Sequence, residues 1–225
     1  LLWTAAGRDG EPRGAVVTLE KNIPMEAGLG GGSSDAAAAL VVLRRIWKLR
    51  IADEELHAIA AMLGSDVPYF LVGGTALGLG RGEEVYPLAD LPPLWVVLVR
   101  PPFGVSTKDA YAWLDAQRRK RGRESFSQDS HEKDSRPRFL PGTWLTGAVP
   151  LGNDLEPPVI ERHPEIGELR NQLRKEGAVL AAMSGSGSTV FGVFTSGAAA
   201  RAAARRLSRT GVDTWCARFQ GRRPR

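Results

Sequence analysis

Hydrophobic positions along the chain follow two periods, one typical of helices and one of strands, and glycine or proline separates most segments. Apolar residues recur at Leu40, Leu43 and Trp47, a spacing that predicts a helix beginning near Ser34. Further helices are expected at residues 54–62, 165–176 and 198–208. Strands are expected at residues 15–20, 75–80, 83–88, 94–99, 178–183, 189–194 and 214–219. Both element types together indicate an α+β protein.

Capping residues sharpen the expected boundaries of two helices. Ser33 and Ser34 are suited to the N-cap of the helix that follows them, and Asp35 suits the positive end of its dipole. Asp53 is expected to cap the helix at residues 54–62 in the same way.

The order of elements after residue 89 is strand, helix, strand, strand, helix, strand. This order predicts a ferredoxin-like layer, and we therefore divide the chain into domains at residues 1–88 and 89–225. Within the second domain, residues 118–138 are rich in Arg, Lys and Ser and contain a single apolar residue, Phe126. Such a segment buries little surface, so we expect a mobile insertion there.

The most informative stretch lies between the first expected strand and the first long helix. It contains Gly28, Gly30, Gly31 and Gly32, followed by two serines. Glycine lets backbone N–H groups approach a ligand closely, and a helix start adds unpaired N–H groups and the helix dipole. Neither the mononucleotide P-loop nor the dinucleotide fingerprint matches, because the loop lacks lysine and Ser33 stands where the fingerprint needs glycine. The sequence therefore predicts a phosphate-binding loop of another kind.

Composition and charge limit the classes of function. The chain has 225 residues, a net charge of +5 and a sequence pI near 9.7, which favours anionic partners. The longest apolar run, residues 36–43, is much shorter than the roughly 20 residues of a membrane span, so no membrane partner is expected. Cys216 is the single cysteine and the three histidines are scattered, so we expect no disulfide, no metal site and a cytoplasmic location. The oligomeric state stays open.

Residues 24–34 resemble the second motif of the GHMP kinases, the superfamily of galactokinase, homoserine kinase and mevalonate kinase. Three later stretches agree with one branch of it: residues 63–70 (LGSDVPYF), 152–156 (GNDLE) and 183–191 (MSGSGSTVF). The resemblance implies an α+β fold of two domains. The amino-terminal one would be like domain 2 of ribosomal protein S5, here incomplete, and the carboxy-terminal one ferredoxin-like.

The resemblance also implies an activity and a set of site residues. The activity is ATP-dependent phosphorylation of the 2-hydroxyl of 4-diphosphocytidyl-2-C-methyl-D-erythritol in the non-mevalonate isoprenoid route, with ATP bound as its magnesium complex. The implied ATP-binding residues are Pro24, Met25, Glu26, Ala27, Gly28, Leu29, Gly30, Gly31, Gly32, Ser33 and Ser34. The implied turn around phosphate and substrate consists of Ser184, Gly185, Ser186 and Gly187.

Two further positions have a role only through the resemblance. Asp66 lies between glycine and proline, which by itself indicates a turn or a cap; the matching aspartate of the family is the active-site acid. Thr107 lies at a helix start, near which relatives bind the substrate, and simple capping is an equal interpretation.

Other interpretations remain open. A GHMP kinase of homoserine or mevalonate type is disfavoured by Asp35, where those enzymes more often carry alanine. A non-catalytic nucleotide- or RNA-binding protein is supported by the pI and by residues 118–138, whereas the leading interpretation has a small-molecule substrate and no nucleic-acid partner. Related kinases carry an early lysine in a longer amino-terminal part, and nothing before Lys21 matches it. We therefore expect an amino-terminally truncated chain with weak activity of its own.

Overall fold

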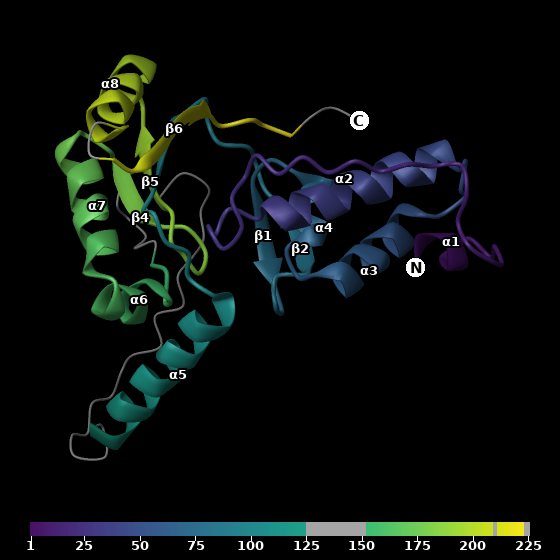
Figure 1. The fold of residues 1–225 in the computed structure, drawn as a ribbon, viewed down its shortest axis with the longest axis horizontal. Coiled ribbons are helices and arrows are strands. Elements are labelled where there is room, and N and C mark those ends of the chain that lie inside the picture. The colour runs from purple at the N-terminus through teal and green to yellow at the C-terminus, as the bar shows by residue number, and fades with distance from the viewer. Residues whose placement is uncertain (125–151, 209–210, 223–225) are drawn as a thin grey trace. The chain divides into compact units, whose positions relative to one another are not determined.

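The computed structural model describes residues 1–124, 152–208 and 211–222, which form two compact units (Figure 1). Unit 1 consists of residues 1–24, 30–90 and 220–222, and unit 2 consists of residues 25–29 and of the described part of residues 91–219. Each unit is discontinuous in sequence, and each has its own hydrophobic core.

Unit 1 combines four helices with one hairpin. Its elements are α1 (Leu2–Ala5), α2 (Gly31–Ile46), α3 (Asp53–Leu63), α4 (Val67–Val72), β1 (Ala76–Leu79) and β2 (Glu84–Pro87). Helices α2, α3 and α4 pack around a small core, to which α2 contributes Ala37 and Leu40 and α3 contributes Leu56 and Ile59. The expected spacing of the apolar face of α2 is confirmed by this burial.

The hairpin of unit 1 is tied to the last described residues of the chain. The Asp90 carboxylate accepts hydrogen bonds from the backbone N–H groups of Thr75 and Arg222, at 2.8 and 2.7 Å. The Arg222 guanidinium donates to the carbonyl oxygens of Thr75 and Leu88. The N–H of Arg222, followed by that of Thr75 and by the Arg222 charge, lowers the pKa of Asp90 below its ordinary value.

Unit 2 is a four-stranded antiparallel sheet with helices. Its elements are β3 (Trp95–Arg100), α5 (Thr107–Glu124), α6 (Glu156–Arg162), α7 (Pro164–Lys175), β4 (Leu180–Met183), β5 (Val190–Phe194), α8 (Gly197–Leu207) and β6 (Asp213–Arg218). The strand order is β4-β5-β3-β6, so β3 is central and β4 is an edge strand. The predicted ferredoxin-like layer is confirmed.

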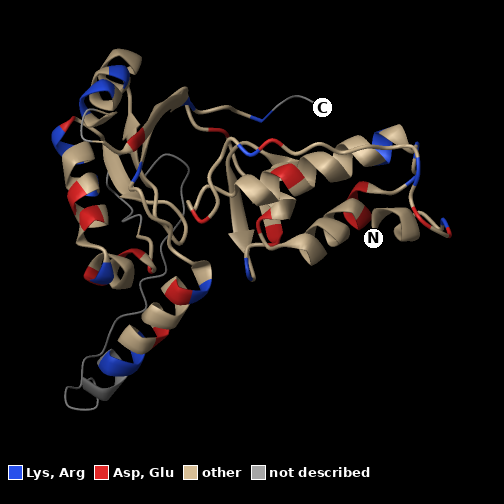
Figure 2. Ribbon diagram, in the orientation of Figure 1, with Lys and Arg blue, Asp and Glu red and all other residues tan. Residues whose placement is uncertain are grey.

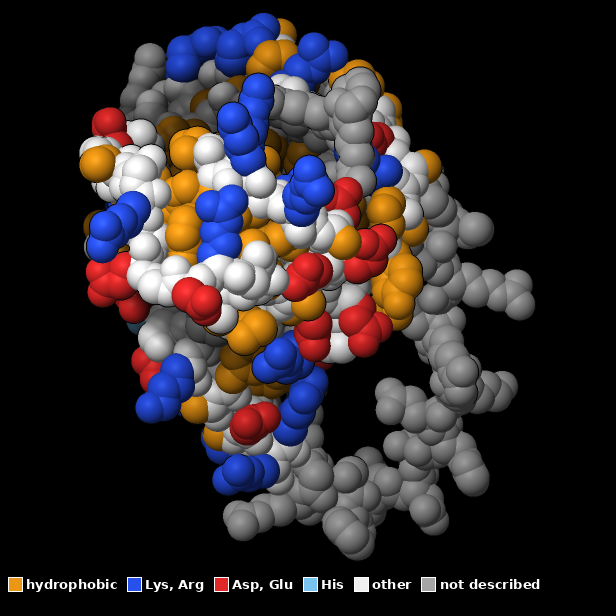
Figure 3. Space-filling model, turned by 90° about the vertical axis from the view of Figure 1, so that its right-hand side faces the viewer, with side chains coloured by type: hydrophobic (Ala, Val, Ile, Leu, Met, Phe, Trp, Pro, Cys, Tyr) orange, Lys and Arg blue, Asp and Glu red, His pale blue; other side chains and the backbone are white. Residues whose placement is uncertain are grey.

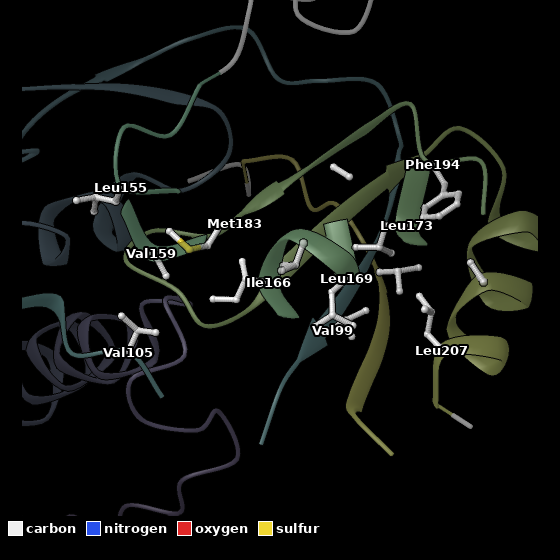
Figure 4. Packing of buried hydrophobic residues seen from close by; sticks show 14 of the residues in the cluster. Val99, Val105, Leu155, Val159, Ile166, Leu169, Leu173, Met183, Phe194 and Leu207 are labelled. Carbon is white, nitrogen blue, oxygen red and sulfur yellow. The ribbon is translucent and has the colours of Figure 1, made fainter. Parts of the chain in front are cut away.

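The core of unit 2 lies between this sheet and the helices that cover it. Helices α7 and α8 lie on the same side of the sheet (Figure 1), and Val97 and Val99 of the central strand are fully buried. Figure 4 shows side chains from α7, β3 and β5 gathered in one cluster, including Leu173 and Phe194. The alternation of buried positions along β3 follows from the period of two of a strand.

Charged residues are spread over many elements. Figure 2 shows residues of both signs along α5 and α7, and Figure 3 shows hydrophobic side chains interspersed with charged ones on the face that it presents. Among the described residues, no helix is both long and apolar enough to cross a lipid bilayer.

Two expectations about local structure were wrong. Residues 15–20 form no strand, and Val16 is 96% exposed. β-prone residues form a strand only when a neighbouring strand accepts their hydrogen bonds, and no described strand pairs with this segment. Residues 118–124 continue helix α5, whereas residues 125–138 of the expected insertion lie outside the described part of the chain.

The expected helix caps were also wrong. Helix α2 begins at Gly31 with Gly30 as its N-cap, so Ser33 and Ser34 are helical and Asp35 lies beyond the first turn. Helix α3 is capped by Ala52 rather than by Asp53. Gly30 adopts the left-handed conformation and serves as the N-cap, so α2 begins before Ser33 and Ser34.

Replacing a buried valine of the central strand should destabilise unit 2. Val97→Ala removes two methyl groups at a site with no exposure, so we expect the free energy of unfolding to fall by about 2 kcal/mol. Chemical denaturation measures the change. Val179→Ala, at a position that is 51% exposed, is the matched control and should cost much less. Equal effects would contradict the assignment of the core.

Asp90→Asn should remove part of the pH dependence of stability. Folding lowers the pKa of Asp90, so its contribution is present above the unfolded-state value of about 3.9 and is lost as the pH falls through the lower folded-state value. Urea denaturation at neutral pH should therefore show a less stable variant, and the difference from wild type should shrink towards pH 2. A difference that does not vary with pH would contradict the Asp90 contacts.

Candidate functional site

Two glycine-bearing turns, far apart in sequence, meet within unit 2. The carbonyl oxygen of Ala27 accepts a hydrogen bond from the N–H of Thr189 at 3.3 Å. The carbonyl oxygen of Gly28 accepts one from the Ser184 hydroxyl at 2.7 Å. The structure thus brings together the predicted phosphate loop and the predicted substrate turn at these residues.

Gly28 has no room for a side chain. Its φ is +69°, in the left-handed region, and an added Cβ would overlap the Ser184 carbonyl oxygen and lie 2.9 Å from the carbonyl oxygen of Gly187. Glycine is therefore required here both by conformation and by the close approach of the second turn.

The second turn joins β4 to β5 and is held by its own backbone. The N–H of Ser184 donates to the Thr189 carbonyl, and the N–H of Gly187 donates to the Ser184 carbonyl, both at 2.9 Å. Ser186 and Gly187 are buried, whereas Gly185 is exposed. The turn is therefore a fixed structure and not an open hairpin loop.

A third segment of unit 2, between β3 and α5, lies against both turns. The Ser188 hydroxyl donates to the Phe103 carbonyl at 2.5 Å, and the N–H of Val105 donates to the Glu26 carbonyl at 3.3 Å. Thr107, the first residue of α5, has its hydroxyl 3.0 Å from that of Ser186. The structure therefore places this predicted substrate residue beside the predicted substrate turn.

Sequence reasoning did not give a role to two polar residues that hold the second turn. Asn153 and Glu156 both hydrogen-bond to Met183, the last residue of β4, and Asn153 also reaches Gly185. An asparagine shortly before a helix often accepts a nearby backbone N–H, and the N–H of Leu155, the N-cap of α6, does donate to its side chain at 3.0 Å. That signal finds Asn153 but does not reveal its other partners.

The second half of the glycine loop begins helix α2 in unit 1. The N–H of Ser34 bonds to the Gly30 carbonyl and its hydroxyl to the Gly31 carbonyl, at 2.9 and 2.7 Å, so Ser34 is used within the helix. Helix geometry leaves the preceding N–H groups, those of Gly31, Gly32 and Ser33, without intrahelical acceptors. These groups, at the positive end of a 16-residue helix, fit phosphate oxygens.

Close packing and one ion pair surround this helix start. An added Cβ at Gly30 would lie 2.9 Å from the Phe70 ring, and one at Gly31 would lie 2.9 Å from Ile23. Lys21 pairs with Asp35 at 2.6 Å. Since a carboxylate near the helix start would repel an anion, this lysine partly offsets an unfavourable charge.

Asp66 lies in unit 1, immediately before α4. Its side chain is exposed, and within the described residues no hydrogen bond or ion pair of its carboxylate is present. An added Cβ at Gly82 would lie 3.9 Å from an Asp66 carboxylate oxygen, so the hairpin turn approaches it. The carboxylate is thus available to an external hydroxyl.

The predicted site residues divide between the two units. Pro24, Gly30 to Ser34 and Asp66 belong to unit 1, whereas Met25 to Leu29, Thr107 and Ser184 to Gly187 belong to unit 2. In the part of the chain that the structure describes, no group of three or more His, Cys, Asp or Glu side chains is arranged to hold a metal ion.

The fold and the paired glycine turns are those of a small-molecule kinase class. Residues 2–74 match the family described as "GHMP kinases N terminal domain", and residues 143–213 match "GHMP kinases C terminal". Kinases of this class use ATP.

Three relatives define the branch. The 4-diphosphocytidyl-2-C-methyl-D-erythritol kinase of Pelotomaculum thermopropionicum is 44% identical, over 93% of this chain and 70% of the relative. The enzyme of that name from Moorella thermoacetica is 43% identical, over 89% of this chain and 69% of the relative. A crystal structure of 4-(cytidine 5'-diphospho)-2C-methyl-D-erythritol kinase has a TM-score of 0.75 and 36% identity, covering 97% of this chain and 75% of its own. The chain belongs to the GHMP kinase family, in the branch of the 4-diphosphocytidyl-2-C-methyl-D-erythritol kinases.

Replacing Gly28 should disturb the packing of the two turns. Gly28→Ala forces a side chain into the left-handed region and against Ser184, so we expect the free energy of unfolding to fall by about 2 kcal/mol or more. The matched control is Gly32→Ala, where nothing lies within 4 Å of an added Cβ and helix propensity favours alanine by up to about 1 kcal/mol. Chemical denaturation compares them, and equal stabilities would refute the close approach at Gly28.

Proposed function

We propose that this protein transfers the γ-phosphoryl group of ATP to the 2-hydroxyl of 4-diphosphocytidyl-2-C-methyl-D-erythritol. The observation that carries the proposal is the joining of the two glycine-bearing turns at Gly28 and Ser184. The names of the relatives support the choice of substrate. We also propose the cytoplasm as the site of action.

The glycine loop is suited to the phosphates of ATP. We assign the phosphate contacts to residues 24–34, with the N–H groups of Gly31, Gly32 and Ser33 as principal donors because helix geometry leaves them without acceptors. Magnesium, bound with the nucleotide, would neutralise charge that develops on the phosphates. The carbonyl oxygens of Ala27 and Gly28, which would repel phosphate, are already hydrogen-bonded within unit 2.

Asp66 has the chemistry of the base or hydroxyl-orienting group. A carboxylate accepts the proton of an attacking hydroxyl, or holds that hydroxyl in line with the phosphorus, and Asp66 is exposed and without an internal partner among the described residues. The turn from Ser184 to Gly187 would close over the reacting phosphate. Thr107, hydrogen-bonded to Ser186, would contact the substrate from the same side of unit 2.

The proposal divides the chain functionally at residues 1–88, which bind ATP, and residues 89–225, which complete the kinase. A homoserine or mevalonate kinase activity is less well supported, since a solved homoserine kinase is only 17% identical to the chain and that likeness concerns the fold alone.

Asp66→Asn should greatly reduce turnover and leave nucleotide binding nearly unchanged. General-base assistance contributes about 10²- to 10⁴-fold, so kcat should fall within that range, whereas the dissociation constant of ATP should stay within about threefold. Steady-state kinetics measures kcat and equilibrium binding measures the dissociation constant, each on protein expressed from the complete reading frame that encodes this chain. Asp9→Asn, at an exposed position of unit 1, is the matched control. A fully active Asp66→Asn enzyme would refute the assigned role, and wild-type protein inactive with this substrate would refute the function.

A further inference from the structure

Two side chains, one shortly before α6 and one at its first residue, bind the end of strand β4. The Asn153 side-chain amide donates to the carbonyl oxygens of Met183 and Gly185, at 3.0 and 2.7 Å. The Glu156 carboxylate accepts the N–H of Met183 at 2.6 Å. Both backbone polar groups of Met183 are therefore bound by side chains that lie about 30 residues earlier in sequence.

The position of β4 in the sheet explains why these groups need partners. In an edge strand, alternate residues turn their N–H and C=O groups away from the neighbouring strand. Ser184 donates to Thr189 on the β5 side, so Met183 and Gly185 face the free edge. Asn153 and Glu156 occupy that edge, in the place that another strand would take.

Burial and charge fix the geometry of this arrangement. Glu156 is 8% exposed, and Arg170 of α7 pairs with its second carboxylate oxygen. A buried carboxylate is stable only when paired and hydrogen-bonded, so Glu156 is held in one orientation. The carbonyl oxygen of the Asn153 side chain accepts the N–H of Leu155, which leaves its amide N–H groups for Met183 and Gly185.

We propose that Asn153 and Glu156 are positioning residues for phosphoryl transfer. They act through the backbone of Met183 and Gly185 and set the conformation of the turn from Ser184 to Gly187. This inference rests on the proposed function, in which that turn closes over the reacting phosphate. A misplacement of about 1 Å at a reacting group can cost on the order of 10²-fold in rate, so a turn held from its edge affects catalysis without touching the substrate.

The variant Asn153→Asp tests the proposal. It keeps an oxygen for the N–H of Leu155, removes both donated hydrogen bonds, and sets a carboxylate oxygen against two carbonyl oxygens. We expect kcat to fall about 10- to 100-fold, with the KM for ATP within about threefold of wild type. Amide hydrogen exchange should accelerate at residues 184–188 and stay unchanged in α7 and α8.

Two further variants make the result specific. Asn171→Asp carries the same chemical change on the exposed surface of α7 and should leave kcat and exchange unchanged. Asn153→Ser keeps a hydroxyl that can accept the N–H of Leu155 but is too short to reach both carbonyls, so it should reproduce the loss of kcat even if Asn153→Asp fails to fold. The kinetic and the hydrogen-exchange measurements both use protein expressed from the complete reading frame that contains the chain.

Wild-type kcat in a folded Asn153 variant would overturn the proposal. Faster exchange throughout unit 2 would overturn it as well, because a general loss of stability would then explain the kinetics. Wild-type protein without turnover would instead refute the proposed function, a result that is distinct from any ratio between variant and wild type.

Discussion

The close approach of Gly28 to Ser184 is the constraint on which the rest of the candidate site depends. A hydroxyl donates to a carbonyl 156 residues away in sequence, at a point where a side chain on Gly28 would overlap the partner backbone. The hydrogen bond between Thr189 and Ala27 continues the contact. Because the carbonyl oxygens of Ala27 and Gly28 already accept hydrogen bonds, they are directed away from a bound anion. The N–H groups of the loop can then face the anion without repulsion from these oxygens.

The second turn is supported from several sides. The segment before α5 holds it through Phe103, and the Thr107 hydroxyl lies against Ser186. At the free edge of β4, Asn153 and Glu156 bind the groups that a neighbouring strand would otherwise bind. Tight turns with buried polar groups are stable only when nearly all those groups are paired, and this explains why polar side chains gather around a turn of small residues.

The helix start in unit 1 supplies the other feature of an anion site. Gly30 turns the chain directly into α2, and the first N–H groups of a long helix are left without acceptors. The packing of Phe70 and Ile23 against Gly30 and Gly31 admits no larger residue without local movement. A loop that must approach phosphate and also pack tightly beneath it therefore requires glycine for two separate reasons.

The sequence by itself determined most of the secondary structure and the position of the glycine loop. Periodicity identified α2, α3, α7 and α8 and every strand of unit 2, because apolar spacing reflects which face of an element is buried. It failed at residues 15–20, since strand formation depends on a hydrogen-bonding partner that propensity does not specify. The capping preference of serine also failed to locate the start of α2, because a left-handed glycine begins the helix before the two serines.

Only the tertiary structure decided which site residues meet. Local patterns describe single elements, whereas the pairing of Ala27 with Thr189, of Thr107 with Ser186 and of Asn153 with Gly185 joins segments that are 32 or more residues apart. Asn153 illustrates the difference: a short polar side chain before a helix is suited to a local backbone bond such as the one from Leu155, but its bonds to an edge strand depend on how the sheet is ordered. The residue types determine which groups can donate or accept hydrogen bonds, whereas the packing of the chain determines which of these groups meet.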